Sequence, residues 1–230
     1  MGQHPGIEIT RGEINQTIFR EFIREDPKLA RLLKGGEVGQ YHQRKQLKQG
    51  KREWFSEKAY LKKNEPRPVI GERRIATQRI TGVDERLRVV ATVIDPPCYF
   101  ADSTNSLVLR SLSNCAMEYV LGLPNSKLYQ WRFKATSTNN NVGTNELACM
   151  PFRVINPEDQ EDKTRHDRIV RLVEQMLALH QKLAKAKSPH DKAALQSQID
   201  ATDRQIDRLV YELHGLTEDE IRIVEGATPS

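Results

Sequence analysis

Two apolar repeats near the C-terminal end restrict the fold of this chain more than any other feature. The first repeat has spacings of three and four residues and consists of Ile169, Leu172, Met176, Leu179 and Leu183. The second has spacings of four and three and consists of Leu195, Ile199, Thr202, Ile206, Leu209 and Leu213. Such spacings place the apolar side chains along one side of a helix. Because only a short segment with Ser188 and Pro189 separates the repeats, we expect two helices packed as an antiparallel hairpin.

The ends of this helical section carry residues that begin and end helices. Asp159 and Glu161 follow Asn156-Pro157, and acidic residues in a first turn favour the helix dipole. Gly215 follows the second repeat, where glycine commonly ends a helix. Residues 217–220 have the pattern of a capping box, which predicts one more helical turn.

The central part of the chain has an apolar period of two, which predicts strands. The predicted strands cover residues 68–70, 75–80, 87–94 and 106–110 and would form a small mixed or antiparallel sheet. Helical spacing predicts flanking helices at residues 13–24, after Asp26-Pro27, and from Pro124 to Thr136. We therefore expect an α+β fold, with a sheet-containing domain over residues 1–156 and a hairpin spacer over residues 157–230.

Positive charge is concentrated in one part of the sequence. Residues 42–92 contain fourteen Lys or Arg and six Asp or Glu, whereas residues 158–230 contain eleven and fifteen. A basic block favours a polyanionic partner, because each phosphate contact releases counterions. The segment around Trp54 and Phe55 is basic and rich in Gln, which fits either a solvated helix face or aromatic side chains interleaved with cations for nucleic acid. A solvated basic surface remains the alternative for the whole block.

An amide-rich loop follows the predicted helix that ends at Thr136. Six consecutive polar residues, 136–141, can donate and accept hydrogen bonds to base edges or phosphates. The same residue types also cap helices and form Asx turns in ordinary loops. Arg73 and Arg79 should share one face of their strand, with Arg74 on the other. The candidate DNA-binding residues are Lys58, Lys62, Lys63, Arg73, Arg74, Arg79, Lys134, Thr138, Asn139, Asn140 and Asn141.

Other classes of site have little support in the sequence. The three cysteines and six histidines are scattered without metal-ligand spacing, so we expect no metal and no disulfide framework. The chain has no run of eighteen apolar residues and no signal-peptide pattern, so we expect a soluble, cytoplasmic protein without a membrane partner. Asp95-Pro96-Pro97-Cys98-Tyr99 resembles the [DN]PP[YF] signature of amino-group methyltransferases. Cys98 interrupts that signature and no glycine-rich turn for a methyl donor is present, so we interpret the segment as a proline turn.

Two longer segments carry a family resemblance. NSKLYQWRFKATSTNNNVGTNEL, followed by Pro151-Phe152, resembles the C-terminal target-recognition region of type IIG restriction-modification enzymes and adenine-specific DNA methyltransferases. Residues 198–221 are similar to the way such chains end, and the segments at 35–41, 75–80 and 103–106 also fit. The resemblance extends over nearly the whole chain from about Gly12.

The resemblance implies a specificity module without catalytic residues of its own. Such a domain docks on double-stranded DNA, reads a short target and presents an adenine to a methyltransferase or restriction catalytic domain or subunit. It would have a helical spacer like that of type I specificity subunits. S-adenosylmethionine would bind to the catalytic partner, and no cofactor is expected in this chain. The alternatives are a non-enzymatic scaffold or adaptor with a basic surface and a helical-hairpin interface, and a self-sufficient methyltransferase built on residues 95–99.

Overall fold

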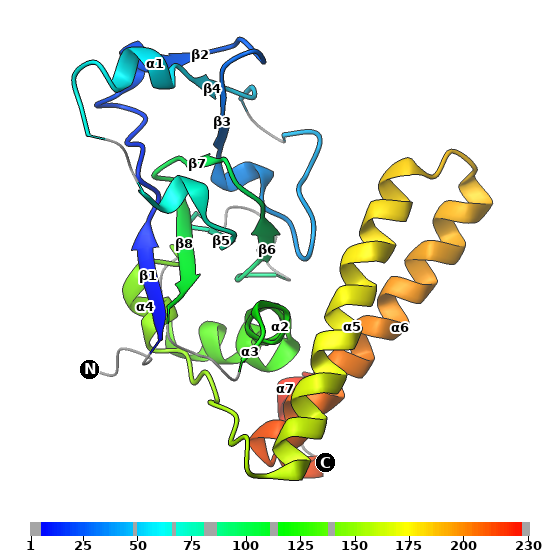
Figure 1. Ribbon diagram of the computed structural model, residues 1–230. Coiled ribbons are helices and arrows are strands. Elements are labelled where there is room, and N and C mark those ends of the chain that lie inside the picture. Colours follow the sequence, from blue (N-terminus) through cyan, green and yellow to red (C-terminus); the bar gives the residue numbers. More distant parts are fainter. Residues whose placement is uncertain are drawn as a thin grey trace. The chain divides into compact units, whose positions relative to one another are not determined.

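The computed structural model describes residues 6–47, 50–65, 68–80, 87–110, 115–137 and 141–226. The chain forms two compact units (Figure 1). Unit 1 consists of Met1–Ser111 and Asn139–Cys149, and unit 2 consists of Leu112–Thr138 and Met150–Ser230. Each unit is made of two separate segments of the chain. The segment at 112–138, which contains the predicted helix ending at Thr136, therefore lies in the unit of the hairpin.

Unit 1 contains two four-stranded sheets. The first is antiparallel, in the order β1-β8-β5-β6, with β1 at Ile7–Arg11, β8 at Thr104–Leu109, β5 at Arg74–Gln78 and β6 at Ala91–Ile94. The second is mixed, in the order β2-β4-β3-β7, with β2 at Ile23–Arg24, β4 at Trp54–Phe55, β3 at Ala30–Leu33 and β7 at Tyr99–Phe100. The expected mixture of sheet and helices is confirmed.

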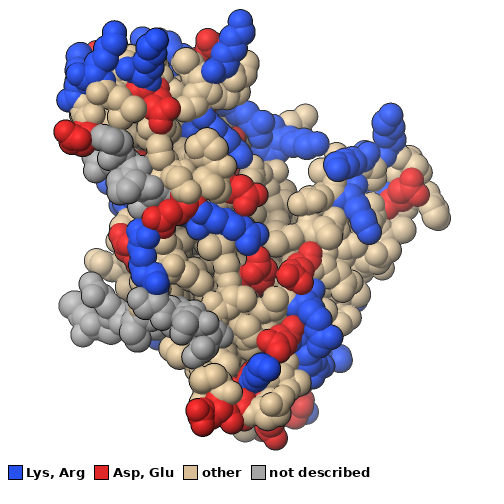
Figure 2. All heavy atoms as spheres, viewed as in Figure 1, with Lys and Arg blue, Asp and Glu red and all other residues tan. Residues whose placement is uncertain are grey.

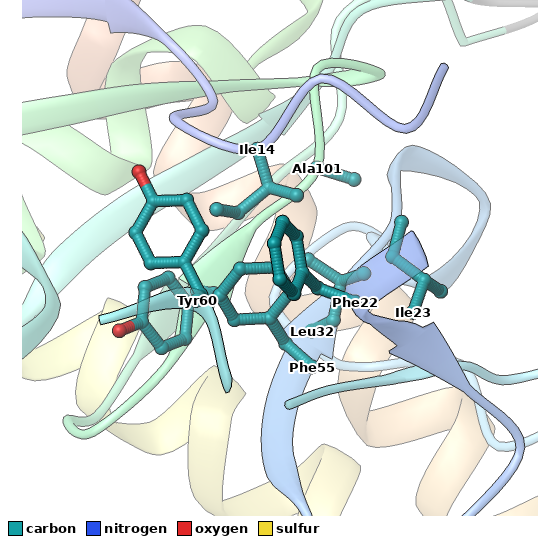
Figure 3. Packing of buried hydrophobic residues seen from close by; sticks show 8 residues of the cluster. Ile14, Phe22, Ile23, Leu32, Phe55, Tyr60 and Ala101 are labelled. Carbon is teal, nitrogen blue, oxygen red and sulfur yellow. The ribbon is translucent and has the colours of Figure 1, made fainter. Parts of the chain in front are cut away.

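Short helices complete unit 1. They are α1 at Glu57–Tyr60, α4 at Thr144–Ala148 and three 3-10 helices: η1 at Arg20–Phe22, η2 at Gly35–Glu37 and η3 at Pro68–Gly71. Next to the mixed sheet, an aromatic core joins side chains from β2, β3, β4, β7 and α1 (Figure 3). Phe55 lies at its centre, with its ring centroid 5.1 Å from that of Tyr60 and 4.6 Å from that of Tyr99. This core holds the very short strands β2 and β4 in place by burying Ile23 and Phe55.

The described parts of unit 2 contain helices and connecting segments but no strand. Its helices are α2 at Met117–Asn125, α3 at Lys127–Thr136, α5 at Gln160–Lys185, α6 at Pro189–His214 and α7 at Glu218–Val224. The predicted hairpin of α5 and α6 is present, and Met176, Leu179, Ile199 and Ile206 are buried in it. Val173 replaces Leu172 as the buried side chain of that turn.

The ends of α5, α6 and α7 lie where the capping residues in the sequence predict them. The Asp159 side chain accepts hydrogen bonds from the backbone N–H groups of Glu161 and Asp162, and the Ser188 hydroxyl accepts one from Asp191. Gly215 has a φ of 66°, the left-handed conformation that ends α6. Thr217 caps α7, together with Glu220. Local signals were therefore sufficient to place these boundaries.

Several predicted elements of unit 1 are wrong. The segment 13–24 contains only η1 before β2, because Ile23 pairs with Phe55 in the mixed sheet. Its helical apolar spacing was misleading, since Ile18 is 71% exposed. Of the leucines after Asp26-Pro27, Leu32 and Leu33 belong to β3, and residues 68–70 lie in η3, not in a strand. In unit 2, Pro124 lies inside α2, so the predicted helix begins at Lys127 instead.

Candidate nucleic-acid interface

The side of the mixed sheet opposite its aromatic core carries a row of cations and one aromatic ring. Across the strands, Arg24 is paired with Trp54, and Trp54 is paired with Arg31. Directly opposite residues in a sheet point to the same face, so these three side chains form a row. The neighbouring residues Ile23 and Phe55 point the other way and are buried in the aromatic core. The row Arg24-Trp54-Arg31 is therefore a surface feature fixed by strand pairing.

A hollow of about 520 Å³ lies beside this row. Pro27, Leu29 and Leu32 supply its apolar lining. Its polar lining includes Arg31, Gln43, Lys45, Arg52 and Trp54, together with the carboxylates of Glu37 and Glu53. In Figure 2, Lys and Arg side chains gather over the end of unit 1 that contains α1, β2 and β4. The hollow thus combines an aromatic ring, an amide and several cations.

The two carboxylates of the hollow are held by neighbouring cations. Glu53 accepts a hydrogen bond from Arg20, and its Oε2 lies 3.3 Å from the Lys34 Nζ. Burial favours the neutral acid, but the hydrogen bonds and charges of Arg20 and Lys34 outweigh it and hold the pKa of Glu53 below its usual value. Glu37 is buried and lies 3.1 Å from the Arg52 Nε. Arg31 instead donates to the amide of Gln43, and no carboxylate pairs with it among the described residues.

A second cluster forms where β5 ends. The Val142 N–H donates to the Arg79 carbonyl at 2.8 Å, and Asn141 pairs with Ile80 in an antiparallel bridge. The Asn105 amide holds this segment by donating to the Val142 carbonyl at 2.7 Å. Ile80 is 58% exposed, and Asn141 is exposed beside it. The end of the amide-rich loop and the end of the basic strand are therefore neighbours, although they lie far apart in the sequence.

Most predicted cations of unit 1 are accessible. Lys58 and Lys62 are exposed on α1 and in the turn after it. Lys63 is also exposed, 3.5 Å from the Glu21 carboxylate. Arg73 is exposed and pairs with Asp95 at 3.2 Å. Exposed ion pairs of this kind contribute little to stability, so these cations can exchange a carboxylate for a phosphate.

Arg79 and the predicted residues near the loop have different positions. Arg79 is half-buried, and its guanidinium lies 3.5 Å from the Asp102 carbonyl oxygen. Lys134 is exposed on α3, in unit 2 and not in the unit of the sheets. Asn141 is exposed as described above. The last three predicted residues, Thr138, Asn139 and Asn140, lie outside the described residues.

Arg74 has a structural position and is removed from the candidate contacts. Its side chain is 1% exposed and donates to both carboxylate oxygens of Glu13 at 3.1 Å. The guanidinium also donates to the Cys98 carbonyl at 2.6 Å and lies 3.7 Å from the centroid of the Phe100 ring. A guanidinium with these partners is not accessible to DNA. Strand alternation placed Arg74 opposite Arg73, but it did not reveal which of the two faces the core.

The prolines of the 95–99 segment form the expected turn between β6 and β7. Burial raises the pKa of the Cys98 thiol to about 11, so the thiol stays protonated. The Tyr99 hydroxyl donates to Glu57 at 2.8 Å, and burial together with this hydrogen bond raises its pKa. Both side chains are core groups. Nothing in this geometry resembles a base-holding methyltransferase site.

Three residues of the surface row were missing from the sequence-based candidates. Arg24 lay in a predicted helix and Arg31 in a predicted helical turn, so neither could be placed beside Trp54. The only signal was Trp54 itself, an aromatic residue inside a basic segment. Among the described residues, no group of three or more His, Cys, Asp or Glu could hold a metal ion, and no helix is long and apolar enough to span a bilayer.

Comparisons with known proteins find a similar fold among solved structures. No family model matches the sequence, and no curated protein matches it. A solved structure of the Type IIL restriction-modification enzyme MmeI in complex with DNA is similar, with a TM-score of 0.60 and 12% sequence identity. The match covers 95% of this chain and 34% of that enzyme, so the chain spans about a third of the enzyme's length. Nearly all of this chain therefore has a fold that also occurs within a restriction-modification enzyme.

Proposed function

We propose that this chain is the DNA target-recognition module of a restriction-modification system, of the type IIG or adenine-specific methyltransferase kind. The observation that carries the proposal is the fold similarity to a restriction-modification enzyme that was solved in complex with DNA, over 95% of this chain. In this proposal the chain binds duplex DNA and reads a short sequence. A methyltransferase or restriction catalytic domain or subunit, with S-adenosylmethionine bound, performs the chemistry.

Exposed and half-buried cations of unit 1 support a contact with the phosphate backbone. Arg24 and Arg31 flank Trp54 on one face, and neither pairs with a carboxylate among the described residues. Lys58 on α1 and Lys62 in the turn after it add charge. Lys and Arg contacts to phosphates fix the position of a protein on DNA without reading its sequence. We assign this positioning role to Arg24 and Arg31 of the row and to the lysines at α1, and not to Trp54.

The cluster at the end of β5 is better suited to reading bases. Asn141 is exposed, and its backbone is tied to Ile80, while Val142 is tied to Arg79. An Asn side chain can pair with both adenine groups that face the major groove, and an Arg can pair with guanine. Such contacts require a side chain held on a firm backbone. The bridge to Ile80, just after β5, supplies that support for Asn141.

The first experiment separates positioning from reading. Fluorescence anisotropy would measure binding to labelled duplexes at several salt concentrations. Replacing Arg24 and Arg31 with Gln should weaken binding to all duplexes and reduce the slope of log K against log salt by about two. The matched control replaces Arg204 and Arg222, which are exposed in unit 2, and should leave the slope unchanged. If the slope of log K against log salt were the same in both double variants, Arg24 and Arg31 would not contact the DNA.

The second experiment tests sequence reading. A pool of random duplexes would first identify the preferred site. Asn141→Ala should then cost about 1 to 3 kcal/mol on that site and little on random DNA. Asn145→Ala is the control, because Asn145 is an exposed amide on α4 in the same unit. If the wild-type chain shows no salt-dependent binding to any duplex, the scaffold or adaptor function is the better account.

A further inference from the structure

The hollow beside Arg24-Trp54-Arg31 contains more than a phosphate contact needs. Phosphates are bound by cations and backbone N–H groups, and they require neither an aromatic ring nor an apolar lining. This hollow has both, because Trp54 and Leu29 line it together with Arg31 and Gln43. Its volume of about 520 Å³ also lies within the range of small-molecule sites, about 300 to 1,000 Å³. The lining therefore fits a ligand that has a flat apolar ring and a negative charge.

The arrangement of the lining suits the two parts of a nucleotide. Strand pairing sets Trp54 directly opposite Arg31, so an aromatic surface and a cation lie side by side. Bases stack on exposed aromatic rings without regard to sequence, and an adjacent arginine can pair with the phosphate. The Gln43 amide binds Arg31 and thereby fixes the direction of its guanidinium. Glu37 and Glu53 are held by Arg52, Arg20 and Lys34, so their charges do not repel a phosphate as free carboxylates would.

A base inside an intact duplex cannot use this site, because both of its faces are covered by neighbouring bases. Stacking on Trp54 requires a nucleotide that has left the stack. We infer that the hollow is a binding site for one unpaired nucleotide, with its base on Trp54 and its phosphate on Arg31. The inference rests on the proposed function, because it assigns a ligand to a surface already proposed to meet duplex DNA. It adds a preference for DNA that carries an unstacked base.

The test uses the fluorescence of Trp54 in the full chain. The protein has two tryptophans, and Trp131→Phe leaves Trp54 as the only one. This variant would be titrated with a duplex, with the same duplex carrying one bulged nucleotide, and with inorganic phosphate. The bulged duplex should quench Trp54 and bind about tenfold more tightly than the plain duplex, as expected for one base stacked on a ring. The plain duplex and phosphate should leave the Trp54 emission nearly unchanged.

Substitution of Trp54 separates this site from general DNA binding. Trp54→Ala should abolish the preference for the bulged duplex while plain-duplex binding, measured by anisotropy, stays within about twofold. Trp54→Phe keeps an aromatic ring and should retain part of the preference for the bulged duplex. This variant distinguishes the loss of stacking from a folding defect. If the bulged duplex binds without quenching Trp54, or if Trp54→Ala keeps the full preference, the nucleotide site is refuted and the proposed function stands. If neither DNA binds, both are refuted.

Discussion

The stability of unit 2 should depend on pH through one buried carboxylate. Asp207 on α6 is 2% exposed, and its Oδ1 accepts a hydrogen bond from the Lys127 N–H at 2.8 Å. Its Oδ2 lies 3.8 Å from the Lys127 Nζ, too far for a hydrogen bond. Asp203 and Glu225 are further acidic groups in its surroundings. Burial, reinforced by these two acids and opposed by Lys127, raises the pKa of Asp207 from 3.8 to about 7.

The sign of the effect follows from proton binding. Because the folded protein binds this proton more tightly than the unfolded chain, stability is highest below the unfolded pKa, near 4, and falls as the pH rises through about 7. At 1.36 kcal/mol per pKa unit, the loss between pH 5 and pH 8 amounts to roughly 3 kcal/mol. Asp207→Asn keeps an acceptor for the Lys127 N–H and removes the charge. The free energy of unfolding of the variant, relative to that of the wild type, should therefore rise by roughly 3 kcal/mol from pH 5 to pH 8.

Urea unfolding followed by far-UV circular dichroism would measure this difference. The wild type and Asp207→Asn would be unfolded at about pH 5 and about pH 8, and the free energies compared at each pH. Other titrating groups, such as the half-buried His214, cancel in the comparison because both proteins contain them. Asp200→Asn is the matched control, since Asp200 is exposed on the same helix. A difference between variant and wild type that is the same at both pH values would refute the assignment of a raised pKa to Asp207.

Four further substitutions test the packing within each of the two units. Leu179→Asp places an unpaired charge in the hairpin and should cost about 3 to 5 kcal/mol, and unchanged thermal melting would contradict the packing of α5 on α6. Gly122→Ala would place a Cβ 3.0 Å from an α5 side chain and should cost about 1 to 3 kcal/mol in urea unfolding, and an unchanged free energy of unfolding would contradict the close packing of α2 on α5. Glu13→Gln leaves the buried Arg74 without its carboxylate and should cost about 3 to 5 kcal/mol, whereas Arg73→Gln should cost under about 1 kcal/mol because that pair is exposed. Similar losses for these two variants would show that Arg74 is not buried as described.

The helical unit was predictable because its signals are local. The repeats in α5 and α6 and the caps at Ser188 and Gly215 lie next to the structure that they determine. The mixed sheet was not predictable for the opposite reason. Its strand β2 has two residues and exists because Ile23 pairs with Phe55, thirty-two positions along the chain. The apolar residues at 13–24 have helical spacing and therefore predicted a helix. The pairing of Ile23 with Phe55 leaves no pattern in the local sequence.

The candidate site was predictable in composition but not in arrangement. The basic block and Trp54 indicated a polyanion-binding surface, yet the partners of Trp54 came from segments expected to be helical. Strand alternation correctly separated Arg73 from Arg74, but only the position of Glu13 decides that Arg74 is the buried one. Likewise, no spacing indicated that Asn141 would lie beside the end of β5. The side chains of this site are brought together by pairing between distant segments, and the spacing of apolar residues does not predict which segments pair.

The charged residues of the helical section at 158–230 are unevenly distributed between its two ends. With fifteen Asp or Glu against eleven Lys or Arg over residues 158–230, the net charge by itself favours a contact with protein over one with DNA. In the structure, exposed lysines lie at the tip (Figure 2): Lys182, Lys185, Lys187 and Lys192. Most acidic residues lie toward the opposite end, around Asp159 and in α7. With 26 residues, α5 is about 39 Å long, several times the Debye length of about 8 Å at physiological salt. The two ends therefore act independently, and the argument for a protein partner applies only to the acidic end.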